Sequence, residues 1–265
     1  MKLAGASIFA EGKRVVHLDL TSDESAYGFG LMIPQSDTER LLTEHLTRQG
    51  ITIERQVELV DFSERADAVD CTLRHADGGE EQYEVPWLLG CDGAHSTVRH
   101  TLGMEFAGYA EPSEWIIADV RIEGPLAPDE VTVFWREAGV TVFFPYKQNQ
   151  FRMIADLGPE AADIEVTLEL AQQLADERGP GGLVLSDPIW LTTFRINERK
   201  VAEYRRGRVM LSGDAAHIHS PAGGQGMNTG MQDAFNLAWK LALVHGGQSP
   251  AEPLLSSYSQ ERSAV

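Results

Sequence analysis

The stretch GRVMLSGDAAHIHSPAGGQGMNTGMQDAFNLAWKL, residues 207–241, decides the fold. It begins as a short apolar strand, reaches Gly213-Asp214, and then passes through a glycine-rich loop into a long helix. A carboxylate at the end of a strand can accept hydrogen bonds from sugar or polyol hydroxyls. Glycines let the backbone approach a ligand closely, and the helix N-terminus offers unpaired N–H groups and a positive dipole end. The stretch therefore predicts a site for an anionic ligand that carries hydroxyl groups.

A second stretch, LGCDGAHSTVR at residues 89–99, runs from a strand into Asp92-Gly93 and then into a short helix that Ser96 or Thr97 could cap. An Asp-Gly pair alone indicates only a turn.

Both stretches resemble the motifs of the FAD-dependent aromatic-ring monooxygenases of the para-hydroxybenzoate-hydroxylase-like family. The resemblance covers nearly the whole chain and is closest to the bacterial aromatic-polyketide hydroxylases. It implies FAD as cofactor, with Asp214 of the Gly213-Asp214 pair on the ribityl chain and Pro221 against the isoalloxazine. The backbone from Gly224 to Asn228 would face the N1–C2=O edge of the flavin, where a helix N-terminus stabilises the negative charge of the reduced ring.

The same resemblance places Asp92 and Gly93 near the pyrophosphate and ribityl region. It also implies a contact from Arg99 to the nicotinamide cofactor, although Arg99 could equally form a salt bridge at a helix end. Gln35, at the entry to a predicted helix, resembles a glutamine that reaches the pyrophosphate end, although it could equally be a polar residue at a helix entry. The expected cofactor-binding residues are Gln35, Asp92, Gly93, Arg99, Gly213, Asp214, Pro221, Gly223, Gly224, Gly226, Met227 and Asn228.

The implied reaction is hydroxylation of a phenolic or polyketide aromatic with NAD(P)H and O2. No residue is identifiable as the catalytic acid or base. Aromatic side chains in residues 132–135 and 142–145 could form the walls of a site for a small aromatic substrate, or they could simply be core. No Gly-x-Ser-x-Gly, Walker or His-Glu-x-x-His sequence favours another enzyme class.

The expected fold is mixed α/β: a partial FAD/NAD(P)-binding domain interlocked with a largely antiparallel substrate-domain sheet. Residues 1–111 and 206–265 are assigned to the former and residues 112–205 to the latter. The patterns predict a hairpin over 14–34, a helix capped by Ser36 and Glu39, and a meander over 51–89 that ends in a buried strand at 87–89. They also predict one helix at 168–178 and a helix after residue 230 with Met231, Ala234, Phe235, Ala238, Leu241 and Ala242 as its apolar face.

Members of the resembled family open with a βαβ unit that carries Gly-x-Gly-x-x-Gly and holds the FAD pyrophosphate. The 265 residues contain no such motif, so the sequence is expected to be truncated at both ends. A mis-called gene start, a split or decayed gene, and a small protein that binds flavin with a partner's help all remain open. The alternative function is a non-catalytic remnant with weak or no FAD binding. An unpaired sheet edge would favour a homodimer or a complementing N-terminal segment.

The composition narrows the class of partner. Lys+Arg 22 against Asp+Glu 40 gives a net charge of −18, which disfavours nucleic acid and anionic membranes. Cys71 and Cys91 match neither a disulfide framework nor a zinc spacing, and His217 and His219 lack a third ligand nearby, so no metal is expected. With no signal sequence and no membrane-length apolar run, the expected location is the cytoplasm.

Overall fold

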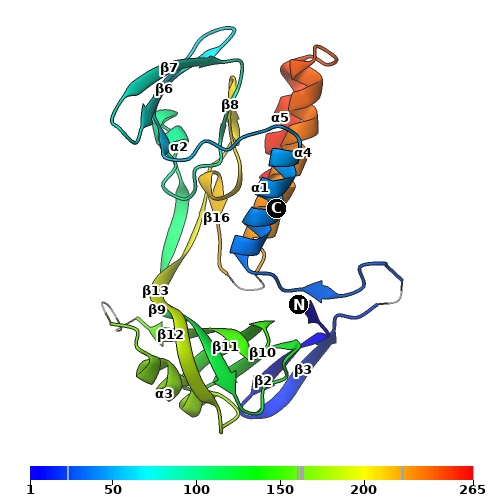
Figure 1. Ribbon diagram of the computed structural model, residues 1–265, viewed down its shortest axis with the longest axis vertical. Coiled ribbons are helices and arrows are strands. Elements are labelled where there is room, and N and C mark those ends of the chain that lie inside the picture. The colour runs from blue at the N-terminus through cyan, green and yellow to red at the C-terminus, as the bar shows by residue number, and fades with distance from the viewer. Residues whose placement is uncertain (23, 160, 162–163, 222–223, 265) are drawn as a thin grey trace. The chain divides into compact units, whose positions relative to one another are not determined.

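The computed structural model describes residues 1–22, 24–159, 161, 164–221 and 224–264. The chain forms two compact units, each built from two separate segments (Figure 1). The first, called here the sheet unit, comprises Met1–Ile53 and Glu111–Arg195; the second, the motif unit, comprises Glu54–Ala110 and Ile196–Val265. Residues 1–53 thus belong to the same compact unit as the sheet, and not to the unit that contains the Asp92-Gly93 stretch. The assignment of residues 1–111 and 206–265 to FAD binding and of residues 112–205 to the substrate stays a prediction. Within the described residues, no helix is long and apolar enough to cross a membrane.

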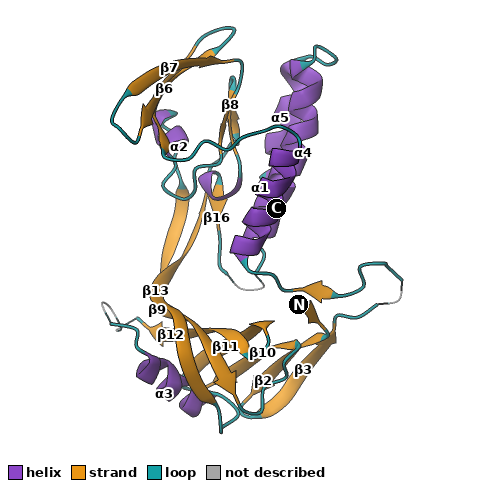
Figure 2. Ribbon diagram, in the orientation of Figure 1, coloured by secondary structure: helices purple, strands orange, loops and turns teal. Residues whose placement is uncertain are grey.

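One large sheet dominates the sheet unit (Figure 2). Its strands follow the order β16-β13-β9-β12-β11-β10-β2-β3. The short strand β16 (His217–Ile218) and the adjoining ends of β9 and β13 belong to the motif unit. The elements are β1 (Lys2–Leu3), β2 (Gly5–Ala10), β3 (Lys13–Asp19), β4 (Gly30–Leu31), α1 (Gln35–Arg48), β9 (Ala107–Glu123), β10 (Glu130–Arg136), β11 (Gly139–Lys147), β12 (Gln150–Gly158), α3 (Leu168–Arg178) and β13 (Val184–Lys200).

The predicted antiparallel sheet and its single helix at 168–178 are confirmed. Alternate residues of the strands pack beneath α3, as the period of two requires; among them are Ile116, Ala118, Phe134 and Phe143. The two aromatic stretches therefore divide between the faces. Phe134 and Phe143 are core residues, whereas Trp135 is 62% exposed on the other face.

The predicted hairpin over 14–34 is wrong. Strand β3 turns back at Glu11-Gly12 and pairs with β2, while β4 pairs with β1. Glu11 and Gly12 both have positive φ, the conformation that a two-residue hairpin turn requires. Strand β2 also pairs in parallel with β10, which joins the N-terminal hairpin to the sheet.

Helix α1 begins at Gln35, directly after Pro34, and no side chain caps it. The predicted capping box is therefore wrong, because Ser36 already lies inside the first turn. The helix ends before Gly50, which has φ +78° after the cap residue Gln49. No residue of α1 is buried.

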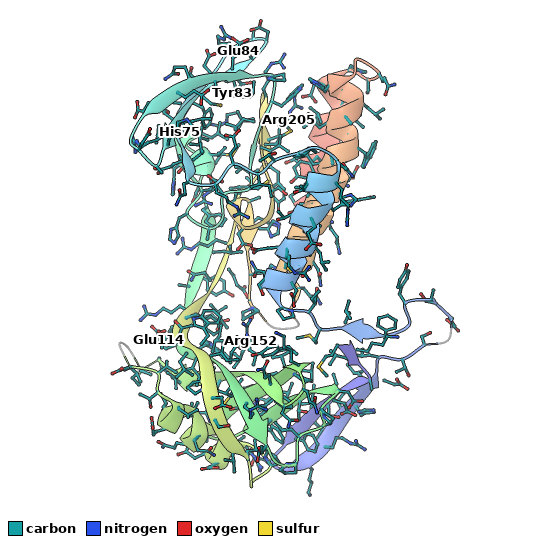
Figure 3. The ribbon with its side chains drawn as sticks, viewed as in Figure 1. His75, Tyr83, Glu84, Glu114, Arg152 and Arg205 are labelled. Atoms are coloured by element: carbon teal, nitrogen blue, oxygen red, sulfur yellow. The ribbon has the colours of Figure 1, made fainter. Side chains whose placement is uncertain are left out.

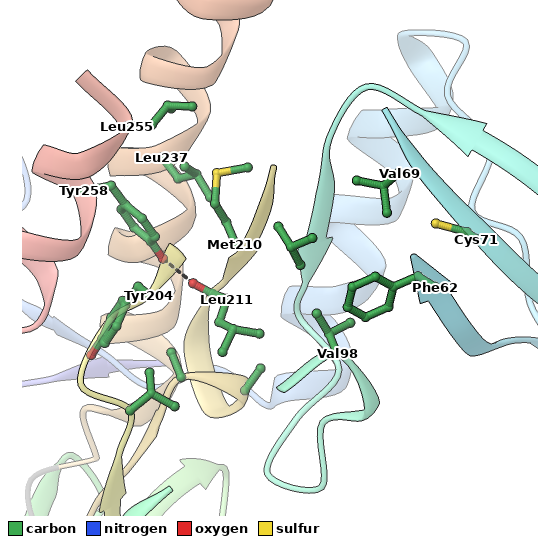
Figure 4. Packing of buried hydrophobic residues seen from close by; sticks show 14 residues of the cluster. Phe62, Val69, Cys71, Val98, Tyr204, Met210, Leu211, Leu237, Leu255 and Tyr258 are labelled. Carbon is green, nitrogen blue, oxygen red and sulfur yellow. Dashed lines mark hydrogen bonds between the residues drawn. The ribbon is translucent and has the colours of Figure 1, made fainter. Parts of the chain in front are cut away.

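The motif unit contains two three-stranded sheets, β5-β6-β7 and β14-β15-β8. Its elements are β5 (Val57–Glu64), β6 (Val69–His75), β7 (Glu80–Val85), β8 (Leu88–Gly90), α2 (Thr97–Thr101), β14 (Arg205–Arg206), β15 (Val209–Leu211), the 3₁₀ turn η1 (Gly213–Ala215), β16 (His217–Ile218), α4 (Gly226–His245) and α5 (Ala251–Arg262). The predicted meander is confirmed. Figure 4 shows the core of this unit, in which Val98, Met210, Leu237 and Tyr258 are fully buried or nearly so.

Two expectations about burial in this unit are wrong. The strand predicted to be buried at residues 87–89 corresponds to β8, which is an edge strand in the sheet formed by the described residues, and its Leu89 is 40% exposed. The predicted apolar face of α4 is also mostly exposed: Phe235 is 79% accessible, although Leu241 packs against the core. The helix instead buries Asp233, Leu237 and Lys240, because its inner face packs on α5 and η1.

Candidate functional site

The two sequence motifs follow neighbouring strands of one sheet. Strand β15 pairs in parallel with β8, so that Leu211 lies opposite Gly90. The amide of Ser212 continues this pairing by donating to the Gly90 carbonyl at 3.0 Å. Parallel strands end at the same edge of a sheet. Asp92 and Asp214, which follow the two strands within three residues, therefore lie at one edge.

The Asp92-Gly93 loop is fixed to helix α2. The Asp92 carboxylate accepts a hydrogen bond from the Val98 amide at 3.0 Å, and the Ser96 hydroxyl accepts one from the Arg99 amide at 2.9 Å. Ser96 is thus the cap, one of the two residues proposed for it. One Asp92 oxygen accepts the hydrogen bond from the helix, and Asp92 is exposed, so that its carboxylate remains accessible to a ligand.

The Gly213-Asp214 turn lies directly on α4. Gly213 has φ +60°, and a Cβ on Gly230 of the helix would come within 3.3 Å of the Gly213 Cα. A side chain at Gly230 would therefore crowd the turn, and one at Gly213 would be strained by the positive φ. Asp214 itself is exposed, so its carboxylate is presented at the end of the buried strand β15.

A buried carboxylate that the sequence motifs did not identify anchors this turn. Asp233 has no exposed surface; it accepts hydrogen bonds from the Gly213 amide at 3.1 Å and from His217 Nε2 at 2.6 Å. Arg262 of α5 donates to its second oxygen at 2.6 Å. Burial alone would raise the pKa of Asp233, but these hydrogen bonds together hold it below its ordinary value. The sequence signal was that Asp233 is the only acidic residue of α4.

Arg99, a buried side chain, links the loop after β8 to the turn after β15. Its guanidinium donates to the Ala215 carbonyl at 3.0 Å and to the Ala94 carbonyl at 2.7 Å, and it lies 3.9 Å from the Phe106 ring centroid. Arg99 is only 2% exposed, and burial lowers its pKa. These contacts give the residue a positioning role between the two strand-end loops, which neither interpretation of the sequence included.

The glycine-rich segment leads into α4 without a side-chain cap. The N-cap residue, Gln225, makes no cap hydrogen bond, so the first-turn amides lack the usual side-chain acceptor. This turn holds three of the predicted cofactor residues, Gly226, Met227 and Asn228. Pro221 and Gly224 precede it, linked by a hydrogen bond from the Gly224 amide to the Pro221 carbonyl. Gly223 lies outside the described residues.

Gln35 belongs to the other unit. It is the first residue of α1, is exposed, and donates through Nε2 to Glu39 at 2.8 Å. Its predicted role at the pyrophosphate stays a prediction.

A cavity of about 460 Å³ adjoins the anchored turn within the motif unit. It is lined by His217, His219, Gln225, Thr229 and Arg262, together with residues of β9 and β13. Three rings form one stack beside it, Tyr204 on His217 and His217 on His219. Asp92 and Asp214 do not line this cavity.

The family model described as FAD binding domain matches residues 2–265. The chain belongs to this FAD binding domain family. The curated relatives include 6-methylpretetramide 4-monooxygenase of Streptomyces rimosus, 42% identical over 98% of this chain and 47% of that protein. Pentachlorophenol 4-monooxygenase of Sphingobium chlorophenolicum is 34% identical over 94% of this chain and 47% of that protein.

Among solved structures of the family, the OxyS anhydrotetracycline hydroxylase from Streptomyces rimosus matches with a TM-score of 0.79 at 34% identity. That match covers 100% of this chain and 53% of OxyS. The chain therefore spans about half the length of the relatives it matches. The resemblance to aromatic-polyketide hydroxylases is confirmed, as is the mixed α/β fold.

The site fits the cofactor of this family. FAD combines a polyol chain, a pyrophosphate and a ring that becomes negative when reduced. An exposed carboxylate can accept from the polyol, and the uncapped first turn of α4 can donate to a negative edge.

Proposed function

We propose that this chain forms the flavin-side and substrate-side parts of an FAD-dependent hydroxylase that uses NAD(P)H and O2 on a phenolic or polycyclic aromatic compound. One observation carries the proposal. Asp92 and Asp214 end two adjacent parallel strands, and the Asp214 turn rests on the helix whose first turn lacks a side-chain cap.

In this proposal Asp214 holds the ribityl chain, and Asp92 faces the ribityl and pyrophosphate region. The first turn of α4, from Gly226 to Asn228, donates its amides to the electron-rich edge of the ring, and Pro221 packs against the ring. Bound FAD would supply the reactivity toward NAD(P)H and O2. The protein's own groups bind, orient and exclude water.

The names of the relatives support an aromatic substrate. One relative is named for 6-methylpretetramide and another for pentachlorophenol. In this chain the sheet face opposite α3 offers half-exposed apolar side chains, including Val142, Phe144 and Ile154, on which a planar ring can lie.

An FAD titration followed by quenching of flavin fluorescence tests the proposal. The Asp214→Ala variant should bind FAD at least about tenfold more weakly than the wild type, since a hydrogen bond to a charged group contributes about 1.5–3 kcal/mol. Asp187→Ala, which removes an exposed carboxylate of the sheet unit, is the matched control and should bind FAD as the wild type does.

Equal FAD affinity in the two variants would overturn the proposed site. NADPH consumption that depends on FAD and on an added phenol, with 18O from O2 in the product, would establish the reaction. NADPH consumption without oxygen transfer to any phenol would favour a different oxidoreductase.

A further inference from the structure

The large sheet has two unequal faces. One face is buried beneath α3. The alternate residues of the same strands point to the opposite face, where their side chains are half exposed. The strand register defines two rows on that second face, across β11, β12 and β9: Val142–Ile154–Ile117 and Phe144–Arg152–Asp119. The first row is wholly apolar, whereas the second carries a charged pair. Removing two charged groups from water costs free energy, so an ion pair on an otherwise apolar surface needs a physical reason.

The pair is rigid and directional. Arg152 Nε donates to Asp119 Oδ1 at 2.8 Å, and Arg152 Nη2 donates to Oδ2 at 2.8 Å (Figure 3 labels Arg152). Asp119 is 8% exposed, but the Arg152 side chain is 41% exposed. The bidentate geometry fixes the plane of the guanidinium and leaves its outer edge accessible.

That outer edge has spare donors. A guanidinium carries five N–H groups, and Asp119 uses two of them. In the part of the chain that the structure describes, the other three N–H groups donate to no protein acceptor, and the Tyr146 hydroxyl makes no hydrogen bond. Tyr146 lies beside the pair: burial raises its pKa, the Asp119 charge raises it further, and Arg152 opposes both. The indole ring of Trp190 lies 5.3 Å from the guanidinium carbon.

A half-exposed apolar face with a few fixed donors fits a particular ligand. The apolar rows and the rings of Phe144 and Trp190 favour a planar hydrocarbon framework, and the spare donors favour oxygen substituents at its rim. The net charge of −18 repels oxyanions at a distance. A locally fixed guanidinium offsets that repulsion where the oxygen must be held.

We propose that Arg152 determines substrate specificity by donating from its free edge to a carbonyl or phenolic oxygen of a planar polycyclic aromatic, with Asp119 as its positioning residue. The ring system lies on Ile154 and Phe144. The proposal rests on the proposed function, because it assigns the substrate of that reaction to this face.

The test compares two probes that differ in their oxygens. They are 1,8-dihydroxyanthraquinone, which carries carbonyl and phenolic oxygens, and pyrene, a planar hydrocarbon without acceptors. Binding to the full chain is measured without FAD or NAD(P)H, from the absorbance shift of the quinone and the vibronic fluorescence ratio of pyrene. Arg152→Met should weaken quinone binding by about tenfold or more and should leave pyrene binding within about twofold.

Two further variants keep the result interpretable. Arg152→Met leaves a buried carboxylate unpaired, so the double variant Asp119→Leu/Arg152→Met provides an apolar replacement that should fold. Arg121→Met is the matched control: it lies two residues beyond Asp119 on β9 and pairs with the exposed Asp187. It should leave both probes unaffected.

If Arg152→Met weakened the binding of both probes equally, Arg152 would have only a packing role and the proposal would be wrong. Unchanged quinone affinity in the double variant would also overturn the proposal. Because the probes need no flavin, either result leaves the FAD titration of the Asp214 variant unaffected. Conversely, FAD affinity that is insensitive to Asp214 would overturn the proposed function without altering the probe result.

Discussion

The imidazole of His217 lies 2.6 Å from the carboxylate of Asp233, a side chain with no exposed surface. Through this contact and the Gly213 amide, Asp233 holds both ends of the turn that presents Asp214. Tyr258 secures the preceding strand by donating to the Leu211 carbonyl at 2.7 Å. The exposed carboxylate of the candidate site is therefore positioned by buried groups behind it.

Asp233→Ala should strongly destabilise the motif unit. The change leaves the largely buried guanidinium of Arg262, the His217 imidazole and the Gly213 amide without their acceptor. Removing one partner of a buried pair costs about 3–5 kcal/mol. The measurement is urea unfolding followed by a probe in the motif unit. Asp187→Ala removes a carboxylate that is 72% exposed from an ion pair and should cost less than about 1 kcal/mol. Similar losses in both variants would contradict a special role for Asp233.

The stability of the motif unit should depend on pH through Asp233. Its pKa is lowered in the folded protein, so the unfolded chain binds the proton more readily. The stabilisation is present above the unfolded value, about 3.9, and is lost as the pH falls through the lower folded value. The groups that face this carboxylate are His217, Arg262 and the Gly213 amide.

The measurement for this pH dependence is the difference in urea midpoint between the wild type and Asp233→Asn, followed from pH 7 downward. The difference should be constant near neutrality and should shrink as the medium becomes more acid than about pH 4. A difference that grows on acidification would contradict the assigned sign.

Local patterns predicted the elements better than their burial. The alternation in residues 112–205 and the helix at 168–178 could be predicted, because the sheet and α3 bury one face each in the expected register. The exposure of the apolar face of α4 could not be predicted, because hydrophobic periodicity identifies an apolar helix face without showing which element, if any, packs against it. The positions of Asp92 and Asp214 followed from motif and strand order. The Asp233 and Arg99 contacts could not be predicted, since they join residues far apart in the sequence.

The exposed stripe on α4 should promote association. Met227, Met231, Phe235 and Trp239 recur every four residues and are 42%, 38%, 79% and 48% exposed. Such a stripe is an apolar interaction surface. Phe235→Glu should reduce concentration-dependent association in sedimentation velocity and leave the urea midpoint nearly unchanged. Tyr27→Glu, at a side chain 82% exposed in the other unit, is the control. Equal effects of both variants would mean that the stripe is not the contact.

The 265-residue chain should bind FAD weakly when purified alone. The flavin-ring half of the candidate site is present in Asp214, Pro221 and the start of α4, but no Gly-x-Gly-x-x-Gly occurs in the sequence. That turn and its helix N-terminus bind the pyrophosphate through several amides and a dipole term of about 0.3–1 kcal/mol or more. Because each 1.4 kcal/mol or so changes affinity tenfold, a chain without these pyrophosphate contacts should bind FAD more weakly by orders of magnitude.

This last expectation is checked by the absorbance of the purified chain and by FAD titration. Joining a βαβ unit that carries Gly-x-Gly-x-x-Gly to the chain should tighten FAD binding and produce the yellow colour. If the fusion folds and stays colourless, the flavin-ring half itself is defective, and the non-catalytic alternative gains support. If the chain alone keeps stoichiometric FAD through gel filtration, Asp214 and the α4 N-terminus hold the flavin without a dinucleotide-binding turn, and the expectation of weak binding is wrong.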